Sequence, residues 1–338
     1  MGILSRLLHR DHAENAQVAH RIDDAIERII KLNPQLRLAR RYHTRLEPAI
    51  AASLKYIGDL VDSVSAPRDA NAAAWSVDPY IHAFFTAPDD VAQTLSRSTD
   101  LREYVEQNAD LREVYAVLGM AMTERRVLGT ALEGDAVHRD VVQTTVNFSD
   151  HRVRICGRTE ADLRQEIVLR LIDQLGLDGL AKIEADNLRR DLLEQERALL
   201  KTRLQLLERK GIGIRSVLGS GAVASSGELG RLQTQIEENE RNLNGLGIRT
   251  EALERQLDHL CEVLTDPSPY IYIESKRFRL DRMNIVLPEN SELPGDDITF
   301  HIARIPTTPP QMRAFTLVRF APNELPPAAS LLASNNGF

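Results

Sequence analysis

Residues 229–264 read LGRLQTQIEENERNLNGLGIRTEALERQLDHLCEVL, and this stretch decides how the rest of the chain is interpreted. Its apolar residues are separated by alternating steps of three and four, which is the heptad spacing of a coiled-coil helix. A second stretch upstream shows the same alternation. The seam positions of the two stretches are Ala185, Leu188, Leu192, Gln195, Leu199, Thr202 and Leu206, then Leu229, Leu232, Ile236, Asn239, Leu243, Leu246, Thr250, Leu253, Leu257, Leu260 and Leu264.

The two stretches are predicted to fold back on each other as an antiparallel coiled-coil hairpin over residues 180–266. In that arrangement the upstream seam positions lie opposite downstream seam positions, for example Leu192 opposite Leu243. The polar Gln195 then lies opposite the polar Asn239. A polar layer weakens a coiled coil but fixes its register, because a slipped pairing would bury an unsatisfied amide.

A Gly- and Ser-rich stretch, 210–227, joins the two arms and is longer than the roughly 2–8 residues that antiparallel helices need. Apolar residues exposed at the end of a projecting rod often mark a contact site. We therefore predict that a protein partner binds this tip, and a flexible loop without a partner is the alternative. The residues predicted to make the contact are Ile212, Ile214, Val217, Leu218 and Val223.

The upstream arm also carries Leu193, Leu200 and Leu207 beside its main seam. This face is broader than one partner helix needs. Two interpretations stay open: the hairpin forms a homo-oligomer through the coiled coil, or the extra face packs on other helices of the same chain.

The chain before the hairpin is mostly helical by its periodicity. Apolar residues recur every three or four positions within 3–32 and again within 35–64, where Pro48 predicts a kink. Cap signals such as Ser98 extend the helical prediction downstream. We predict two helical regions, 1–66 and 72–135.

Alternating residues predict strands on both sides of the coiled coil. A short hairpin is expected at 142–156, with its turn at 147–150, followed by a helix that starts at Thr159 and stops near Gly176 and Gly179. Four or five strands follow Pro267. The predicted fold is α+β and mostly α: the helical regions, a small α+β domain with an antiparallel sheet formed by 136–179 and 267–320, the long hairpin inserted before the C-terminal strands, and a disordered tail, 321–338.

Composition excludes several classes of protein. The chain has 338 residues, 43% of them hydrophobic and 27% charged, so we expect a folded protein. No uncharged apolar stretch approaches the roughly 20 residues of a membrane span, so no integral membrane segment is predicted. The net charge of −7 makes nucleic acid an improbable partner. The two cysteines lack a CxxC spacing, and a cytoplasmic location is predicted, with peripheral membrane attachment left open.

No pattern in the sequence predicts catalysis, and we predict no cofactor, metal or catalytic residue. His9 and His12 lie three residues apart but lack further metal ligands. His138-Arg139-Asp140 lacks the Asn spacing of a kinase catalytic loop. The sequence therefore favours a non-enzymatic interaction or scaffold protein, although enzyme activity is left undecided.

Two other interpretations are kept. Arginines of the β-rich domain can converge into a basic groove that would serve an enzyme or an anion- or nucleic-acid-binding protein. An amphipathic N-terminal helix can bind a membrane surface or a partner helix. The candidate residues are Arg152, Arg154, Arg277, Arg279 and Arg304 for the groove, and Ile3, Leu4, Leu7 and Leu8 for the helix.

Overall fold

The computed structural model of the protein describes residues 3–133, 136–218, 224–246, 249–289, 291, 293–305 and 311–325. It is 58% helical and 26% strand, which confirms the prediction of a mixed helix and sheet protein. The chain forms two compact units. We call residues 1–50 with 175–265 the helical unit, and residues 51–174 with 266–338 the sheet unit.

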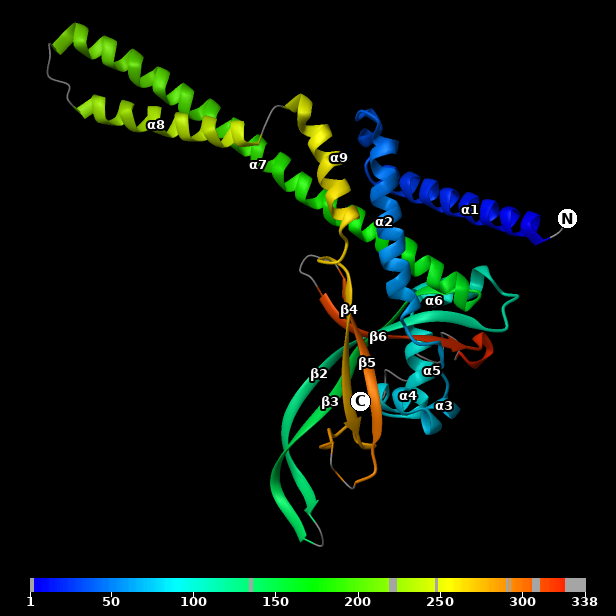
Figure 1. Ribbon diagram of the computed structural model, residues 1–338. Coiled ribbons are helices and arrows are strands. Elements are labelled where there is room, and N and C mark those ends of the chain that lie inside the picture. The colour runs from blue at the N-terminus through cyan, green and yellow to red at the C-terminus, as the bar shows by residue number, and fades with distance from the viewer. Residues whose placement is uncertain are drawn as a thin grey trace. The chain divides into compact units, whose positions relative to one another are not determined.

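The helical unit is built from five helices and one 3₁₀ turn within the described residues (Figure 1). Its buried side chains include Ile26, Ile50 and Leu257. The elements are α1 (Ile3–Leu32), η1 (Pro34–Leu38), the first part of α2 (Tyr42–Asp62), α7 (Glu160–Leu218) from Leu175 onward, α8 (Ala224–Gly245) and α9 (Arg249–Thr265).

Two glycines of α7 make room for neighbouring helices. A Cβ on Gly176 would lie 2.4 Å from Cδ1 of Ile29 in α1, and one on Gly179 would lie 3.0 Å from Cδ1 of Leu260 in α9. The prediction that a helix stops at these glycines is wrong, because α7 continues to Leu218. The glycines serve close helix packing instead of a C-cap.

The first predicted helices are confirmed with one change. α1 covers 3–32 as expected, but the second predicted helix is divided into η1 and α2. The Asn33 side chain caps η1 by accepting a hydrogen bond from the backbone N–H of Gln35. Arg41, with φ of 50°, separates the two helical pieces, since this left-handed conformation cannot continue a right-handed helix.

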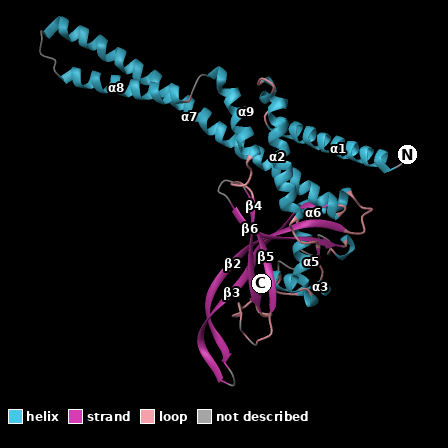
Figure 2. Cartoon of the chain, viewed as in Figure 1, coloured by secondary structure: helices cyan, strands magenta, loops and turns pink. Residues whose placement is uncertain are grey.

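The sheet unit holds a six-stranded sheet whose main path runs in the order β3-β2-β6-β5-β4 with antiparallel neighbours (Figure 2). A short β1 pairs in parallel with β6. The antiparallel sheet predicted from the sequence is thereby confirmed. The strands are β1 (Arg68–Asp69), β2 (Val114–Glu133), β3 (Ala136–Gly157), β4 (Tyr272–Leu280), β5 (Asp296–Ile305) and β6 (Gln311–Phe320).

The prediction of helix throughout 72–135 is partly wrong. Four short helices are present, but residues 114–133 form strand β2. Val114, Ala116 and Leu118 are fully buried at every second position, which is the period of a strand. The helices are α3 (Ala72–Val77), α4 (Pro79–Phe84), α5 (Pro88–Arg97) and α6 (Thr99–Gln107), the last capped by Ser98 as predicted.

The predicted hairpin at 142–156 is also different. Both of its strands belong to the single strand β3, which pairs with β2. Residues 147–149 of the predicted turn pair regularly with β2, and a bulge follows them, where the register shifts between Gly119 and Ala121 and Asp150 has φ of 49°. A bulge adds residues to one strand without ending it, so the turn-like sequence does not reverse the chain.

The C-terminal residues 321–325 do not belong to a disordered tail as predicted. Residues 322–324 form a 3₁₀ turn, η2 (Pro322–Glu324), and Leu325 packs against the main core of the sheet unit. Among the described residues, no helix has the length and apolar character needed to cross a membrane.

Candidate functional site

Helices α7 and α8 of the helical unit lie antiparallel and side by side in Figure 1, and ion pairs connect them. Arg203 of α7 pairs with Glu228 of α8 at 2.7 Å, and Lys201 pairs with Glu240 at 2.8 Å. The predicted seam of α8 is largely buried, with Leu232, Ile236, Asn239 and Leu243 each at most 9% exposed.

The predicted seam of α7 is exposed. Four of its leucines are more than half exposed: Leu188 at 60%, Leu192 at 65%, Leu199 at 72% and Leu206 at 55%. We call these four residues the leucine stripe. Its position differs from the prediction, which placed the same leucines against α8.

A neighbouring face of α7 is covered instead. Arg190 is buried and donates a hydrogen bond to the carbonyl oxygen of Leu246 at the end of α8. Leu193, Leu200 and Leu207, which the sequence analysis left as an extra face, are half-buried. Leucines at heptad spacing occur on two faces of α7, so the spacing alone does not select the one that meets α8.

The predicted polar pair also differs. Asn239 is buried, but its Nδ2 donates to Oε2 of Glu196 at 3.0 Å, and Gln195 is exposed. The Oδ1 atom of Asn239 is buried with no hydrogen-bond partner among the described residues. Asn239 therefore bonds to Glu196 of α7, one residue after the predicted partner Gln195, because α7 presents a different face to α8 than the predicted one.

Two sets of predicted contact residues have side chains outside the described residues. The backbone of α7 continues through four of the tip residues, so helix extends into the predicted loop; these are Ile212, Ile214, Val217 and Leu218. Val223 lies outside the described residues. The predicted membrane-binding residues Ile3, Leu4, Leu7 and Leu8 lie in the backbone of α1. Both contacts stay predictions.

A pocket of about 580 Å³ lies within the sheet unit, between one face of the sheet and two helices. The last turn of α2 and the first turns of α7 cover it, while β2, β3, β6, the end of β5 and the start of β4 form its floor. Most of its lining is aliphatic. The lining residues are Leu60, Val61, Val64, Val117, Gly119, Arg152, Arg154, Ile155, Ile167, Leu171, Gln174, Ile271, Tyr272, Ile273, Ala303, Arg304, Arg313, Phe315 and Leu317.

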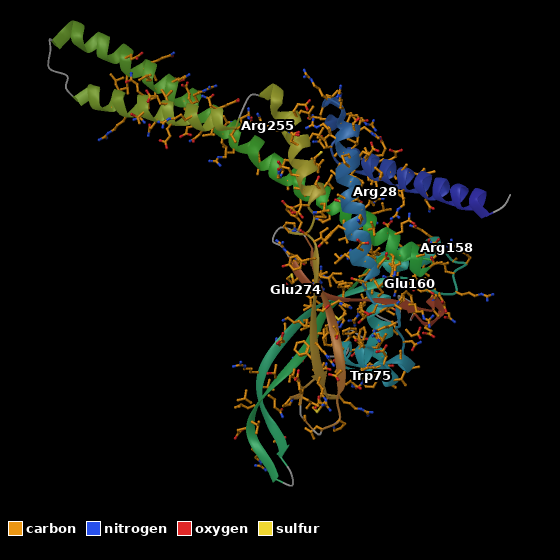
Figure 3. All side chains as sticks on the ribbon, in the orientation of Figure 1. Arg28, Trp75, Arg158, Glu160, Arg255 and Glu274 are labelled. Carbon is orange, nitrogen blue, oxygen red and sulfur yellow. The ribbon has the colours of Figure 1, made fainter. Side chains whose placement is uncertain are left out.

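The two covering helices are held together by Arg164 of α7. Its guanidinium donates to the carbonyl oxygens of Val61 at 2.5 Å and Val64 at 3.0 Å, at the end of α2. Glu160, labelled in Figure 3, pairs with the same guanidinium at 2.7 Å. These bonds satisfy carbonyl groups that a helix end leaves open, and they fix the roof of the pocket.

Four arginines line the pocket. Arg152 and Arg313 both bond to Asp150, with Nε of Arg152 at 3.0 Å from Oδ1 and Nη1 of Arg313 at 2.8 Å from Oδ2. Arg154 pairs with Asp100 at 2.9 Å. Arg304 donates to the neutral carbonyl oxygen of Pro269 and lies 5.6 Å from the ring centre of Tyr272.

The structure therefore brings together three of the five arginines proposed for a basic groove, namely Arg152, Arg154 and Arg304. The other two do not line this pocket: Arg277 pairs with Asp297 at 3.5 Å, and Arg279 donates to the backbone carbonyls of Glu289 and Leu293. Arg313 also lines the pocket and was not among the predicted residues. Its signal was the two-residue spacing from Phe315 and Leu317, which puts all three on one face of β6.

A β-bulge places two consecutive residues of β3 in the pocket. The register shifts between Ala116 and Val117, and Ile155 adopts φ of 50° at this point. Arg154 and Ile155 consequently both line the pocket, although neighbours on a regular strand point to opposite faces.

Three titratable side chains, Asp150, Cys156 and Cys261, have pKa values shifted by their surroundings. Hydrogen bonds from Arg313 and then Arg152 lower the pKa of Asp150, so this carboxylate is ionised at neutral pH. Burial raises the pKa of Cys156 to about 12, and burial raises that of Cys261 to about 11. Neither thiol is a nucleophile at neutral pH, because the thiolate is the reactive form.

Among the described residues, no group of three or more His, Cys, Asp or Glu side chains is placed to hold a metal ion. Comparison of the chain with models of protein families, with curated proteins and with solved structures finds no match.

Proposed function

We propose that the protein is a non-enzymatic interaction protein in which α7 and α8 form an antiparallel coiled-coil hairpin and the leucine stripe of α7 binds a second copy of this chain. The observation that supports this proposal is the exposure of four leucines at heptad spacing on one helix face. The predicted tip, 210–227, serves as a further contact for a protein partner.

The leucine stripe has the form of a helix-binding surface. It extends from Leu188 to Leu206, which is about 27 Å along a helix. Its leucines alternate with the polar seam residues Gln195 and Thr202 in steps of three and four, and a seam of this kind packs against another helix. Exposed apolar surface of this continuity is uncommon unless it is an interaction site.

A second copy fits the stripe because the spacing of the seam is the same when it is read backwards. In an antiparallel pair of α7 helices, Leu188 lies opposite the partner's Leu206, Leu192 opposite the partner's Thr202, and Gln195 opposite the partner's Leu199. Each seam position meets a seam position in both directions. This is the requirement for a two-fold symmetric interface, in which the same surface is used twice.

The test is the molar mass of the full chain in solution, measured by sedimentation equilibrium. We expect a dimer for the natural chain and a monomer for the Leu192→Glu, Leu199→Glu double variant, because two charges at the seam centre would be buried without partners. The control is Ala198→Glu, Gln205→Glu, which adds the same charge at exposed positions beside the stripe. Circular dichroism checks that both variants keep their helix content.

Two results would overturn the proposal. One is a natural chain that stays monomeric at tens of micromolar concentration. The other is a dimer that survives the Leu192→Glu, Leu199→Glu change as well as it survives the control, since that dimer would use another surface.

A further inference from the structure

We propose that the pocket of the sheet unit binds a single-chain amphiphile with an anionic head group: its hydrocarbon chain occupies the aliphatic part, and its carboxylate or phosphate lies at the arginines. This inference is independent of the leucine stripe, which belongs to the helical unit.

The size and lining of the pocket indicate an apolar ligand segment. Its volume of about 580 Å³ falls within the roughly 300–1,000 Å³ of small-molecule sites. Side chains such as Val117, Ile167 and Leu171 give water few hydrogen-bond partners. Burial of a hydrocarbon chain there would remove apolar surface from water on both molecules, which is favourable in proportion to the area covered.

The charges around the pocket indicate an anionic head. Four arginines line it, and Asp150 and Asp100 are the carboxylates bonded to three of them. This leaves a surplus of two positive charges among these six side chains, and the described lining residues include no Asp or Glu. Arginine binds carboxylate and phosphate through paired N–H groups, so both heads have the chemistry that these residues recognise.

Arg304 is the arginine best suited to the head group. Within the described part of the chain its partners are the neutral Pro269 carbonyl and the Tyr272 ring, so an incoming anion need not displace a carboxylate of that part from it. Arg313, in contrast, is held by two bonds to Asp150 and has a side chain only 17% exposed. Arg313 is therefore expected to stay bonded to Asp150 as part of the pocket wall, and Arg304 is expected to contact the ligand.

Gly119 keeps the space beside the arginines open. A Cβ built on this residue would meet only the Arg152 carbonyl oxygen at 3.8 Å and Nε of Arg313 at 3.9 Å, which are ordinary contacts. The backbone therefore accepts a side chain there. A large side chain at this position would extend into the pocket beside Arg152 and Arg313.

The mixed lining of the pocket, which is aliphatic with arginines, favours an amphiphile over a free inorganic anion or a neutral hydrocarbon. A free inorganic anion would leave the aliphatic part of the pocket without a partner, and a neutral hydrocarbon would leave the surplus positive charge unmatched. An amphiphile satisfies both parts at once.

The test is isothermal titration of the delipidated full chain with four probes: dodecanoate, dodecyl phosphate, dodecanol and inorganic phosphate, each below its micelle concentration. We expect one dodecanoate or dodecyl phosphate per chain, with dodecanol at least about tenfold weaker and inorganic phosphate weaker still. Which of the two anions binds more tightly identifies the source of the ligand as a fatty acid or a phospholipid derivative. Binding of dodecanol as tight as binding of both anions, or binding of none of the probes, would overturn the proposal.

Matched variants locate the binding. Arg304→Gln should weaken binding of the anionic probe about tenfold, as loss of one charge-assisted contact predicts. Arg277→Gln removes the same charge from an exposed strand position outside the pocket and should leave affinity unchanged. Equal losses in the two variants would overturn the head-group assignment.

Gly119→Leu should abolish binding by occupying the pocket, and Gly119→Ala should weaken it less. The fluorescence of Trp75 checks that each variant is folded, and Gly119→Ala keeps the test valid if the leucine variant does not fold. Unchanged affinity in the folded Gly119 variants would place the ligand elsewhere and overturn the proposal.

Discussion

The two faces of the sheet carry side chains from the same strands but differ in how they are filled. On one face, 21 buried hydrophobic residues from the strands, from α4 to α6 and from their connections pack together. On the other face, the buried cluster among the described residues consists of Val64, Leu163 and Leu317, and the pocket lies beside them. The difference indicates that the first face contributes more of the buried core of the sheet unit, while the second face has room for a pocket under α2 and α7.

Alternation along each strand produces this difference. On β3, Val153 belongs to the filled face while Arg152 and Arg154 line the pocket. On β6, Ala314 belongs to the filled face while Arg313 and Phe315 line the pocket. A strand places successive side chains on opposite faces, so one short sequence can supply a core and a polar wall together.

The largest expected effect tests the filled face. Phe300 is 2% exposed, and its ring lies 4.9 Å from Phe148 and 5.7 Å from Phe84. We expect Phe300→Ala to lower the free energy of unfolding by about 3–5 kcal/mol, because it leaves a cavity among aromatic rings. The matched change Phe315→Ala, at a half-buried residue of the pocket face, should cost less than about 1.5 kcal/mol.

Urea unfolding followed by Trp75 fluorescence measures both changes, because Trp75 is the one tryptophan and packs against the filled face. Equal losses for Phe300→Ala and Phe315→Ala would contradict the difference between the two faces.

A second, smaller effect uses neighbouring residues of β2. Ala116 is fully buried on the filled face, and Val117 lines the pocket. We expect Ala116→Leu to lower the free energy of unfolding by about 1–3 kcal/mol, since a packed core has no space for the larger side chain. Val117→Leu should change it by no more than about 0.5 kcal/mol, since the pocket accepts the added volume. The same urea titration applies, and a larger loss from Val117→Leu than from Ala116→Leu would show that the pocket is closed.

Local periodicity was sufficient to predict which segments are helix or strand in most of the chain. It was not sufficient to predict which face of a helix or strand packs against its neighbour. Residues 114–133 were predicted as helix because cap signals such as Ser98 extend the helical prediction downstream. Tertiary pairing with β6 and β3 decides their strand conformation. The stop predicted at Gly176 failed because a glycine also permits close packing of helices.

The candidate sites show the same limit. On α7, leucines at 192 and 199 and leucines at 193 and 200 satisfy the same spacing, so the face that meets α8 depends on contacts with the other helix. For the pocket, alternation correctly put Arg152 and Arg154 on one face of a strand. It did not predict that β6 would insert between β2 and β5, and that strand order is what brings Arg313 and its register partner Ala303 to the same pocket.

The smallest expected effect concerns two consecutive residues at the bulge of β3, one for each face. His151 stacks on Phe85 at 4.9 Å and bonds through Nε2 to the Phe84 carbonyl oxygen at 2.8 Å, and burial lowers its pKa. Asp150 bonds to the pocket arginines, which lower its pKa. Both groups bind protons more readily in the unfolded chain, so each contributes stability that is lost as pH falls.

The two losses occur in different pH ranges. His151 destabilises the fold as pH falls below about 6.5, the ordinary pKa of histidine, and Asp150 does so below about 4. We expect His151→Gln to flatten the decline in the free energy of unfolding between pH 7 and pH 5, leaving the part that belongs to His301, whose pKa is also lowered by burial. Asp150→Asn should leave that range unchanged and flatten the decline only at lower pH, by a small amount because the carboxylate is 47% exposed. Urea titrations at a series of pH values measure both slopes.

The contradicting outcome is a histidine variant that keeps the full decline between pH 7 and pH 5. In that case His151 would have to be accessible to protons in the folded chain. The filled face would then be less closed around it than its packing against Phe84 and Phe85 indicates.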